Sequence, residues 1–318
     1  MLQTEGMLTV LLATRNRANL LRGVLETYLN LPSPMTGWKL VVVDNGSTDE
    51  TAQVLAAFAD RLPLQSVLEP TLGKNFALNR GLAAAEGDLV VFTDDDAFPH
   101  PRWLVELRKA ADAHSEFTMF GGAIVPRWQV APPPWVQWID DPGPVYTITD
   151  PALQEGPVDE VLIFGPNMAV RNSVFQAGTR FDPSIGPRGT SYPMGSETEL
   201  LVRLGRQGHK AWHVPGAVVE HFIREEQLKK DWVLQRATRW GRGRFRMSQK
   251  SRLWLGLPHH LFRDIPWEAM LIAAARVSFR QRALFRAQWR LKVLCGMASE
   301  SRLVRRERRA QNQSLSAC

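Results

Sequence analysis

The chain has 318 residues, 44% of them hydrophobic and 22% charged, a composition typical of globular proteins rather than of long disordered regions. It has only two cysteines, Cys295 and Cys318, which excludes a disulfide framework and favours a cytosolic protein. Charge is uneven along the chain: residues 1–221 hold 17 basic and 25 acidic side chains, whereas residues 222–318 hold 22 and 7. A basic tail on an acidic body predicts an anionic partner for the tail.

The amino-terminal residues predict no signal peptide, because residues 1–17 have no basic segment before their short apolar run and no small-residue cleavage site after it. The best candidate for a membrane span, residues 267–279, is shorter than the ~20 residues that a span requires and contains Glu268 and Arg276. We therefore expect a cytoplasmic protein.

Continuous apolar runs alternate with stretches of helical periodicity over the first third of the chain. Strands are predicted at residues 7–13, 38–44, 64–69 and 88–94. Helices are predicted within residues 18–31, 45–62 and 75–87. Buried strands that alternate with amphipathic helices indicate an α/β fold, with a parallel sheet covered on both faces. In such sheets, ligands bind beyond the carboxyl ends of the strands.

The next segments continue this pattern with one interruption. A fifth strand is predicted at residues 117–126, a strand and a short helix within 161–183, an amphipathic helix at 195–208 and a last strand at 210–221. Residues 127–160 are rich in proline and tryptophan and lack periodicity, which indicates a long functional loop or insertion. From Phe222 onward the pattern is helical.

Three consecutive carboxylates, Asp94, Asp95 and Asp96, follow the fourth predicted strand. Carboxylates at the end of a buried strand are costly to desolvate, but a divalent cation neutralises them. Mg²⁺ and Mn²⁺ prefer oxygen ligands and bind phosphates in the same shell. The alternative is a simple turn whose aspartates cap a helix that starts near Pro101. Because the triplet follows a buried strand at the expected ligand edge, we favour the cation site.

Several motifs in a fixed order carry a family resemblance. They are TVLLATRNR (9–17), VVVDNGSTDET (41–51), GKNFALNRGLAAAEGDLVVFTDDDAFPHPRWL (73–104), FGPNMAVRNSVFQAGTRFD (164–182), GSETELLVRL (195–204) and VVEHF (218–222). With these motifs the chain resembles the family 2 glycosyltransferases, which are inverting enzymes of the GT-A fold with a D-x-D motif. The resemblance implies a Rossmann-like, mostly parallel central sheet with helices on both faces, followed here by a basic helical C-terminal region.

The resemblance also implies roles for the residues along the expected ligand edge. Ala13, Thr14, Arg15 and Arg17 would hold the base and ribose of the nucleotide, and Asp44 would accept a hydrogen bond from the base. Asp94 or Asp95 would reach the ribose, whereas Asp96 would ligate a divalent cation, Mn²⁺ or Mg²⁺. His221 matches a histidine that binds the metal or the diphosphate in some members, although a lone histidine is more often structural.

Three further parts of the motifs, at Lys74, at Asn79 and around Asp44, have a structural interpretation beside the functional one. Lys74 would lie near the nucleotide or its phosphates, or it is a solvated loop lysine. Asn79 would support the same edge or face the neighbouring loop. In the segment that contains Asp44, Ser47 or Thr48 is expected to cap the following helix as well.

Glu197 is the expected general base for the acceptor hydroxyl. The family pattern is glycine, glutamate, aspartate and then TEL, whereas this chain reads GSETEL, so Ser196 replaces the glutamate and Glu197 the aspartate. Glutamate keeps the carboxylate but is one methylene longer. Glu199 is the rival, and in a purely structural reading both acids complement a helix N-terminus.

The resemblance divides the chain at His221. Residues 1–221 would form the catalytic domain, with a nucleotide-sugar-binding half at 1–125 and an acceptor and catalytic half at 126–221. Residues 222–318 would form a basic helical tail. The insertion with Trp128, Trp135 and Trp138 is either an acceptor wall, because indoles stack on sugars and lipids, or a surface loop that packs on the body.

The tail mixes Arg, Trp, Phe and Leu, as do helices that lie on anionic lipid, so we expect it to associate peripherally with the cytoplasmic face of the membrane or to cap the catalytic domain. An RNA-binding arm is a third reading, but no recognised nucleic-acid module is present and no nucleic-acid partner is expected.

The predicted function is transfer of a sugar, with inversion, from a nucleoside-diphosphate sugar to a hydroxyl acceptor. The resemblance places it in polysaccharide, glycolipid or cell-envelope glycan synthesis, with a glycan or lipid-linked acceptor. The rivals are a sugar nucleotidyltransferase, which would need a glycine-rich loop that is missing before Gly23, and a non-catalytic nucleotide-sugar-binding protein of the same fold.

Overall fold

The computed structural model describes residues 6–34, 37–189, 192–248, 253–254 and 256–315, with side chains up to residue 310. The chain forms two compact units. The first, which we call the sheet unit, comprises Met1–Gln129, Pro142–Pro183 and Ser196–Ile223. The second, the helical unit, comprises Val130–Asp141, Ser184–Gly195 and Arg224–Cys318. Two short segments from the middle of the sequence therefore belong with the C-terminal helices.

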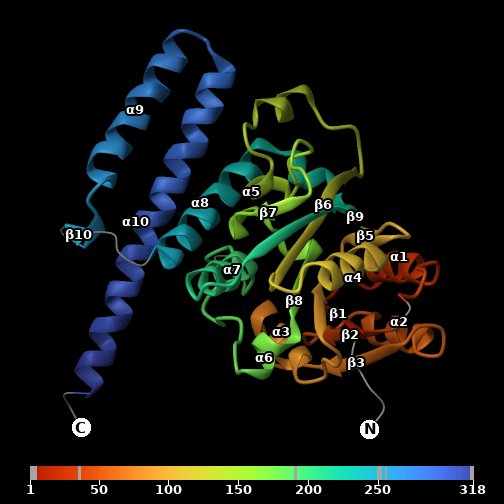
Figure 1. Ribbon diagram of the computed structural model, residues 1–318. Helices are drawn as coiled ribbons and strands as arrows, with labels where there is room; N and C mark the ends of the chain where they lie inside the picture. Colours follow the sequence, from red (N-terminus) through yellow and green to blue (C-terminus); the bar gives the residue numbers. More distant parts are fainter. Residues whose placement is uncertain (1–5, 35–36, 190–191, 249–252, 255, 316–318) are drawn as a thin grey trace. The chain divides into compact units, whose positions relative to one another are not determined.

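A mixed, mostly parallel sheet organises the sheet unit (Figure 1). Its strands are β1 (Leu8–Thr14), β2 (Trp38–Asp44), β3 (Leu64–Leu68), β4 (Leu89–Phe92), β5 (Ala97–Pro99), β6 (Met119–Trp128), β7 (Gly156–Val158), β8 (Met168–Arg171) and β9 (Ala211–Ile223). They lie in the order β3-β2-β1-β4-β8-β6-β9-β5, and β7 also pairs with β9. Strands β1 to β4 run parallel, β8 runs antiparallel to β4 and β6, and β9 runs parallel to β6. The predicted α/β architecture is confirmed.

Helices cover both faces of this sheet. Successive side chains of a strand point to opposite faces, and β1 shows the consequence: Leu8, Val10 and Leu12 pack in one core, whereas Leu11 packs in the other. The first core is completed by α1 (Ala18–Tyr28), α2 (Thr51–Phe58) and α4 (Trp103–Ala113). The second is completed by α3 (Lys74–Leu82), α6 (Asn172–Gln176) and α7 (Ser196–Arg206).

The start of α2 corrects one prediction, because neither Ser47 nor Thr48 caps this helix. The backbone N–H of Ser47 donates to Asp44 Oδ1 at 2.8 Å, and Ser47 Oγ accepts from the backbone N–H of Asn16 at 3.0 Å. The backbone N–H of Thr48 in turn donates to Asn16 Oδ1 at 2.7 Å. Both residues therefore tie the loop after β2 to the loop after β1, and α2 begins only at Thr51.

The helical unit contains three long helices, α8 (Lys230–Met247), α9 (Leu261–Val277) and α10 (Gln281–Leu315), and a short hairpin of β10 (Leu253–Trp254) and β11 (Leu257–Pro258). Helices α8 and α10 meet at glycines: a Cβ on Gly241 would lie 1.9 Å from the carbonyl oxygen of Val293, and one on Gly296 would lie 2.1 Å from that of Thr238. Among the described residues, no helix combines the length and apolarity that crossing a bilayer requires.

Part of the tryptophan-rich insertion packs within the helical unit. The rings of Trp135 and Trp138, in a 3₁₀ helix (η1, Pro134–Trp138), have centroids 5.3 Å and 6.4 Å from that of Phe285 on α10. The Lys230 ammonium lies 4.5 Å from the centroid of Trp138. Trp128 instead ends β6 in the sheet unit, with its ring 5.5 Å from that of Tyr146. Of the three tryptophans, only Trp128 thus packs on the body as the surface-loop alternative expected, and the role of an acceptor wall stays a prediction.

Candidate functional site

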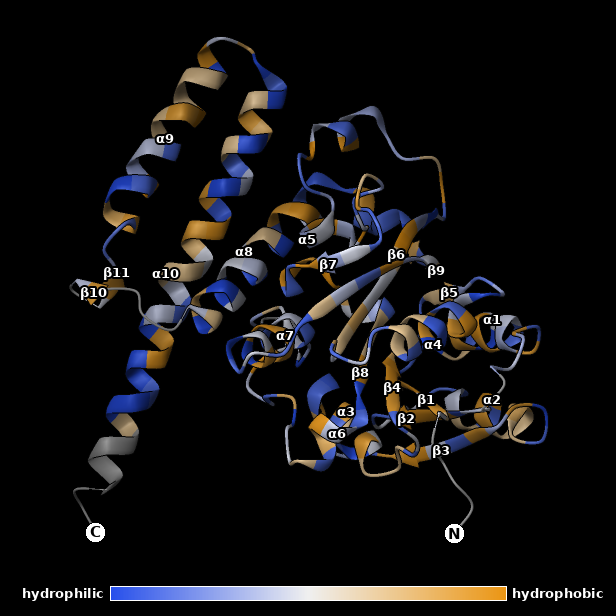
Figure 2. Cartoon of the chain, viewed as in Figure 1, coloured by the Kyte–Doolittle hydropathy of each residue, from blue (hydrophilic) through white to orange (hydrophobic). Residues whose placement is uncertain are grey.

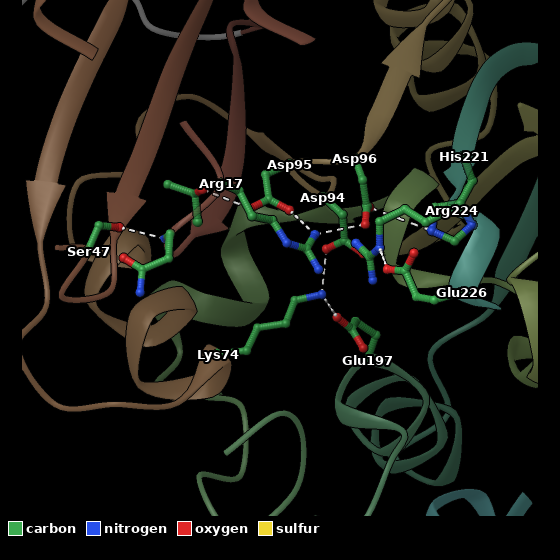
Figure 3. Close-up of polar contacts among 12 residues, drawn as sticks. Arg17, Ser47, Lys74, Asp94, Asp95, Asp96, Glu197, His221, Arg224 and Glu226 are labelled. Atoms are coloured by element: carbon green, nitrogen blue, oxygen red, sulfur yellow. Dashed lines mark hydrogen bonds and ion pairs between the residues drawn. The ribbon is translucent and has the colours of Figure 1, made fainter. Parts of the chain in front are cut away.

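The aspartate triplet begins at the second residue after β4, and Asp95 and Asp96 are held by side chains at the end of β1 and in the loop that follows it. Thr14 Oγ1 donates to Asp95 Oδ2 at 2.7 Å. Arg17 Nη1 donates to Asp95 Oδ1 at 2.6 Å and to Asp96 Oδ2 at 2.8 Å (Figure 3). The alternative that the aspartates cap a helix near Pro101 is wrong, because α4 begins at Trp103 and has no side-chain cap.

Lys74 joins the triplet to the expected base. It is the first residue of α3, and its Nζ lies 2.5 Å from Asp94 Oδ1 and 2.6 Å from Glu197 Oε1 (Figure 3). Burial alone would lower the pKa of Lys74, but the carboxylates of Asp94 and Glu197 outweigh it and raise that pKa. The side chain is only 18% exposed, so the reading of a solvated loop lysine is wrong.

Glu197 points into the site from the first turn of α7. It packs against Gly165, where a Cβ would lie 2.6 Å from both Cγ and Cδ of Glu197. Glu199 is oriented along its own helix instead, because its two carboxylate oxygens accept from Arg203 Nε and Nη2 at 2.9 and 3.0 Å. Of the two acids, Glu197 therefore lies among the other site residues.

His221 approaches the triplet from β9, where it pairs with Ala97 of β5. Its Nδ1 lies 2.6 Å from the carbonyl oxygen of Tyr146, which can only accept, so Nδ1 carries a proton. Its Nε2 lies 3.6 Å from Asp96 Oδ1. Nε2 is therefore the ring nitrogen that could ligate a divalent cation together with Asp96.

Four carboxylates and two cations meet in this site. Lys74 pairs with Asp94 and Glu197, and Arg17 pairs with Asp95 and Asp96. Burial raises the pKa of Asp95 to about 6, although nearby Arg17 opposes this shift.

Protein side chains alone do not form a closed metal cage here. Within the part of the chain that the structure describes, no group of three or more His, Cys, Asp or Glu side chains is arranged to hold a metal ion. Mg²⁺ and Mn²⁺ fit such an open site, because they are commonly held by one or two carboxylates together with substrate phosphates and water. Asp96 Oδ1 and His221 Nε2 face each other in this site at 3.6 Å.

The other predicted residues lie around this cluster. Ala13 pairs with Val43 near the ends of β1 and β2, and Arg15 is exposed in the loop that follows β1. Asp44 ends β2, 9% exposed, and accepts from the backbone N–H of Ser47. Asn79 faces the neighbouring loop rather than the site, since it exchanges hydrogen bonds of 2.9 Å with the backbone of Phe181.

Asn45 is a supporting residue that our sequence analysis missed. Its side-chain nitrogen donates to the carbonyl oxygens of Glu69 and Thr71 at 2.9 and 2.8 Å, and its Oδ1 accepts from the backbone N–H of Gly73 at 2.8 Å. These bonds hold the loop that leads into Lys74. The only signal in the sequence was an amide residue next to Asp44.

The family of this chain is shown by its similarity to known proteins. The sequence profile described as "Glycosyl transferase family 2" matches residues 9–175, more than half of the chain. The chain belongs to glycosyl transferase family 2. The expected family is thus confirmed, and with it the GT-A fold.

Curated relatives of this family 2 chain are distant. It is 23% identical over 211 residues to the glucosyl-dolichyl phosphate glucuronosyltransferase of Haloferax volcanii, covering 63% of this chain and 64% of that protein. It is 24% identical over 249 residues to the probable glycosyltransferase YdaM of Bacillus subtilis, covering 74% and 54%. The chain therefore spans less than two thirds of either relative.

Two solved structures share the fold of this family 2 protein. One is the mannosyltransferase PcManGT from Pyrobaculum calidifontis in complex with GDP-Man and Mn²⁺, with a TM-score of 0.63 and 19% identity over 92% of this chain and 86% of that one. The other is S. aureus TarS 1-349 in complex with UDP-GlcNAc, with a TM-score of 0.54 and 16% identity over 95% and 92%. At these identities the similarity establishes the fold alone.

Proposed function

We propose that this protein transfers a sugar from a nucleoside-diphosphate sugar to a hydroxyl acceptor with inversion at the anomeric carbon. The observation that carries the proposal is the junction of the aspartate triplet with Glu197 through Lys74. A diphosphate-binding acidic edge and a carboxylate able to accept a proton are the two parts that such a reaction requires.

In the proposed reaction, Glu197 accepts the proton of the acceptor hydroxyl. The hydroxyl oxygen then forms a bond to the anomeric carbon as the bond between that carbon and the diphosphate oxygen breaks, and the electron pair leaves with the diphosphate. The attack and the departure lie on opposite faces of the sugar, so the anomeric centre inverts and no covalent enzyme intermediate is needed.

Lys74 has two proposed roles in this cycle. Before the donor binds, it offsets the charges of Asp94 and Glu197, and it favours the ionised form of Glu197 that can accept a proton. The donor diphosphate brings further negative charge to the same edge. We propose that Lys74 then turns toward the diphosphate, which leaves Glu197 a stronger base.

We propose Asp96 and His221 as the ligands of a divalent cation, Mn²⁺ or Mg²⁺. The facing donor atoms of these two side chains support this assignment. When bound, such a cation supplies a positive charge that stabilises the departing diphosphate. The Nδ1–H bond from His221 to Tyr146 fixes the ring with Nε2 toward Asp96.

The nucleoside is proposed to lie along the ends of β1 and β2, on Ala13, Thr14, Arg15, Arg17 and Asp44. Asp94 or Asp95 is the proposed contact to the ribose. The support for this placement is the set of hydrogen bonds that joins the loop after β1 to the loop after β2 through Asn16 and Ser47.

For the whole protein we propose synthesis of a polysaccharide, a glycolipid or a cell-envelope glycan, with a glycan or lipid-linked acceptor. The proposed division into a donor half at 1–125, an acceptor half at 126–221 and a tail at 222–318 follows from the same resemblance. We propose a cytoplasmic location with peripheral membrane attachment through the tail, on the support of its excess of basic side chains.

A thermal-shift screen of UDP-, GDP- and dTDP-sugars with and without Mn²⁺ tests this proposal. We expect one nucleotide class to raise the melting temperature, only with the metal, and the effect to be lost in Asp96→Ala. Slow release of nucleoside diphosphate from that donor would support transfer, whereas release of pyrophosphate would indicate a nucleotidyltransferase. Binding without any turnover across a panel of hydroxyl acceptors and water would point to a non-catalytic protein.

A further inference from the structure

Helix α9 exposes one apolar side whose only charges are positive. At about 100° per residue, its exposed residues fall on roughly half of the helix circumference. They are Phe262, Arg263, Pro266, Trp267, Ala269, Met270, Ala273, Ala274, Arg276 and Val277. Trp267, Met270 and Val277 are 56%, 51% and 81% exposed, unusually high for large apolar side chains, and Figure 2 shows apolar residues recurring along this helix.

The acidic residues of α9 lie off this side. Glu268 is only 7% exposed and accepts from Arg290 Nε of α10 at 2.7 Å. Asp264 is half-buried and accepts from Arg263 Nε at 2.8 Å. Glu268 is thus directed toward α10, whereas Asp264 pairs with Arg263 at the edge of the exposed side. A helix that exposes large apolar side chains between arginines has the reverse of the usual arrangement for a helix facing water.

The turn from α9 into α10 extends the same surface. Phe279 is 85% exposed and has a φ of 54°, in the left-handed region that bulky side chains rarely adopt. Arg280 and Arg282 are exposed beside it. The backbone of this turn thus holds a large aromatic ring in water next to two arginines. We call the exposed side of α9 together with this turn the α9 face.

We propose that the α9 face binds the surface of an anionic lipid bilayer, with α9 lying in the interface. Apolar side chains enter the boundary between headgroups and acyl chains, while arginines pair with anionic headgroups. Trp267 is suited to this depth, because indoles favour the membrane interface. This inference rests on the proposed peripheral attachment and is independent of the proposed chemistry.

The composition of the α9 face disfavours other partners. A second copy docked face to face would bring arginines against arginines, without acids on the surface to pair with them. A nucleic acid would match the arginines but would leave Met270, Val277 and Phe279 exposed to water. The headgroups of an anionic bilayer would pair with the arginines, and its acyl region would remove the apolar side chains from water.

Flotation of the full-length protein with vesicles tests the proposal. We expect binding to phosphatidylcholine vesicles that contain about one third phosphatidylglycerol, little binding to pure phosphatidylcholine, and release by salt. The double variant Met270→Glu, Val277→Glu should lose at least about tenfold in apparent affinity, and Arg280→Gln about fivefold. Val161→Glu, at another exposed apolar position in the sheet unit (42% exposed), should bind like the wild type.

Circular dichroism and donor hydrolysis without vesicles provide the controls, since the variants should keep both whether or not they bind lipid. Equal binding to neutral and anionic vesicles, or no binding, would overturn the proposal. So would a double variant that floats like the wild type. A wild-type dimer that Met270→Glu converts to a monomer would assign the α9 face to a second copy instead.

Discussion

The ammonium of Lys74 lies 2.6 Å from the Glu197 carboxylate. The proposed base of the reaction is therefore ion-paired in the protein without donor, with a lysine that also holds Asp94. A nearby cation favours the ionised form of a carboxylate, so this pairing opposes proton uptake by the proposed base while the pair is intact. We propose that the donor diphosphate offers Lys74 an alternative partner, which would couple donor binding to activation of the base.

Replacing Lys74 by Met should lower the free energy of unfolding of the donor-free protein. The substitution leaves Asp94 and Glu197 without this cation although both side chains are largely buried, and we expect a loss of about 2 kcal/mol in the free energy of unfolding at pH 7. Urea denaturation measures this difference. Lys74→Arg keeps the charge and should recover most of the stability, and a Lys74→Met variant as stable as the wild type would contradict the importance of the pairing.

Replacing Glu197 and replacing Glu199, the two acids in the first turn of α7, should have different effects on kcat. Glu197→Gln removes the proposed proton acceptor, so we expect kcat to fall by about 10²–10⁴ with little change in donor affinity. Glu199→Gln loses only an i,i+4 pair with Arg203, worth about 0.3–0.5 kcal/mol of stability, and should keep its kcat. If Glu199→Gln were the slower enzyme, the base assignment would be wrong.

Gly165 offers a test of how Glu197 is positioned. A methyl group there would lie 2.6 Å from Cγ and Cδ of Glu197 and would displace its carboxylate. We expect Gly165→Ala to lower kcat by about tenfold or more while calorimetry shows unchanged donor binding. Gly23→Ala is the matched control, because its nearest contact would be an ordinary 3.7 Å from Phe98. Equal kcat values for Gly165→Ala and Gly23→Ala would show that the reaction does not depend on the present position of the Glu197 carboxylate.

The burial of His213 predicts that the free energy of unfolding depends on pH. It is 2% exposed on β9, and burial lowers its pKa below the ordinary value of 6.5. Below pH 6.5 the unfolded chain binds this proton while the folded protein resists it, so the free energy of unfolding should fall as the pH decreases. The slope from one such group is at most about 1.4 kcal/mol per pH unit.

Chemical denaturation between pH 7 and pH 5 measures this slope. His213→Gln should flatten it. An identical slope in His213→Gln and the wild type would assign the acid sensitivity to other groups.

Much of the fold could be predicted because its signals are local. The apolar runs that became β1, β2 and β4 are continuous and bounded by polar loops, and the strand that ends near His221 is β9. The strand Ala97–Pro99 was missed, since three residues after the aspartates have no periodicity of their own and gain strand structure only by pairing with β9. Membership of Val130–Asp141 in the helical unit likewise depends on distant contacts to α10.

The candidate site was predictable as a set of residue types at one sheet edge, but not as a set of pairs. Nothing in the spacing from Arg17 to Asp95, or from Lys74 to Glu197, indicates that these side chains meet. Those contacts arise because β1 and β4 are neighbours and because α7 returns to the sheet some 120 residues after Lys74. Long-range topology of this kind is absent from local sequence patterns.

We propose that the acidic edge binds a divalent cation together with the donor diphosphate, and titration calorimetry with Mn²⁺ tests this binding most directly. With saturating nucleoside diphosphate of the class that stabilises the protein, we expect one Mn²⁺ per chain for the wild type and a loss of at least about tenfold in affinity for Asp96→Ala. Equal Mn²⁺ binding by Asp96→Ala and the wild type, or no Mn²⁺ binding by either protein, would contradict it.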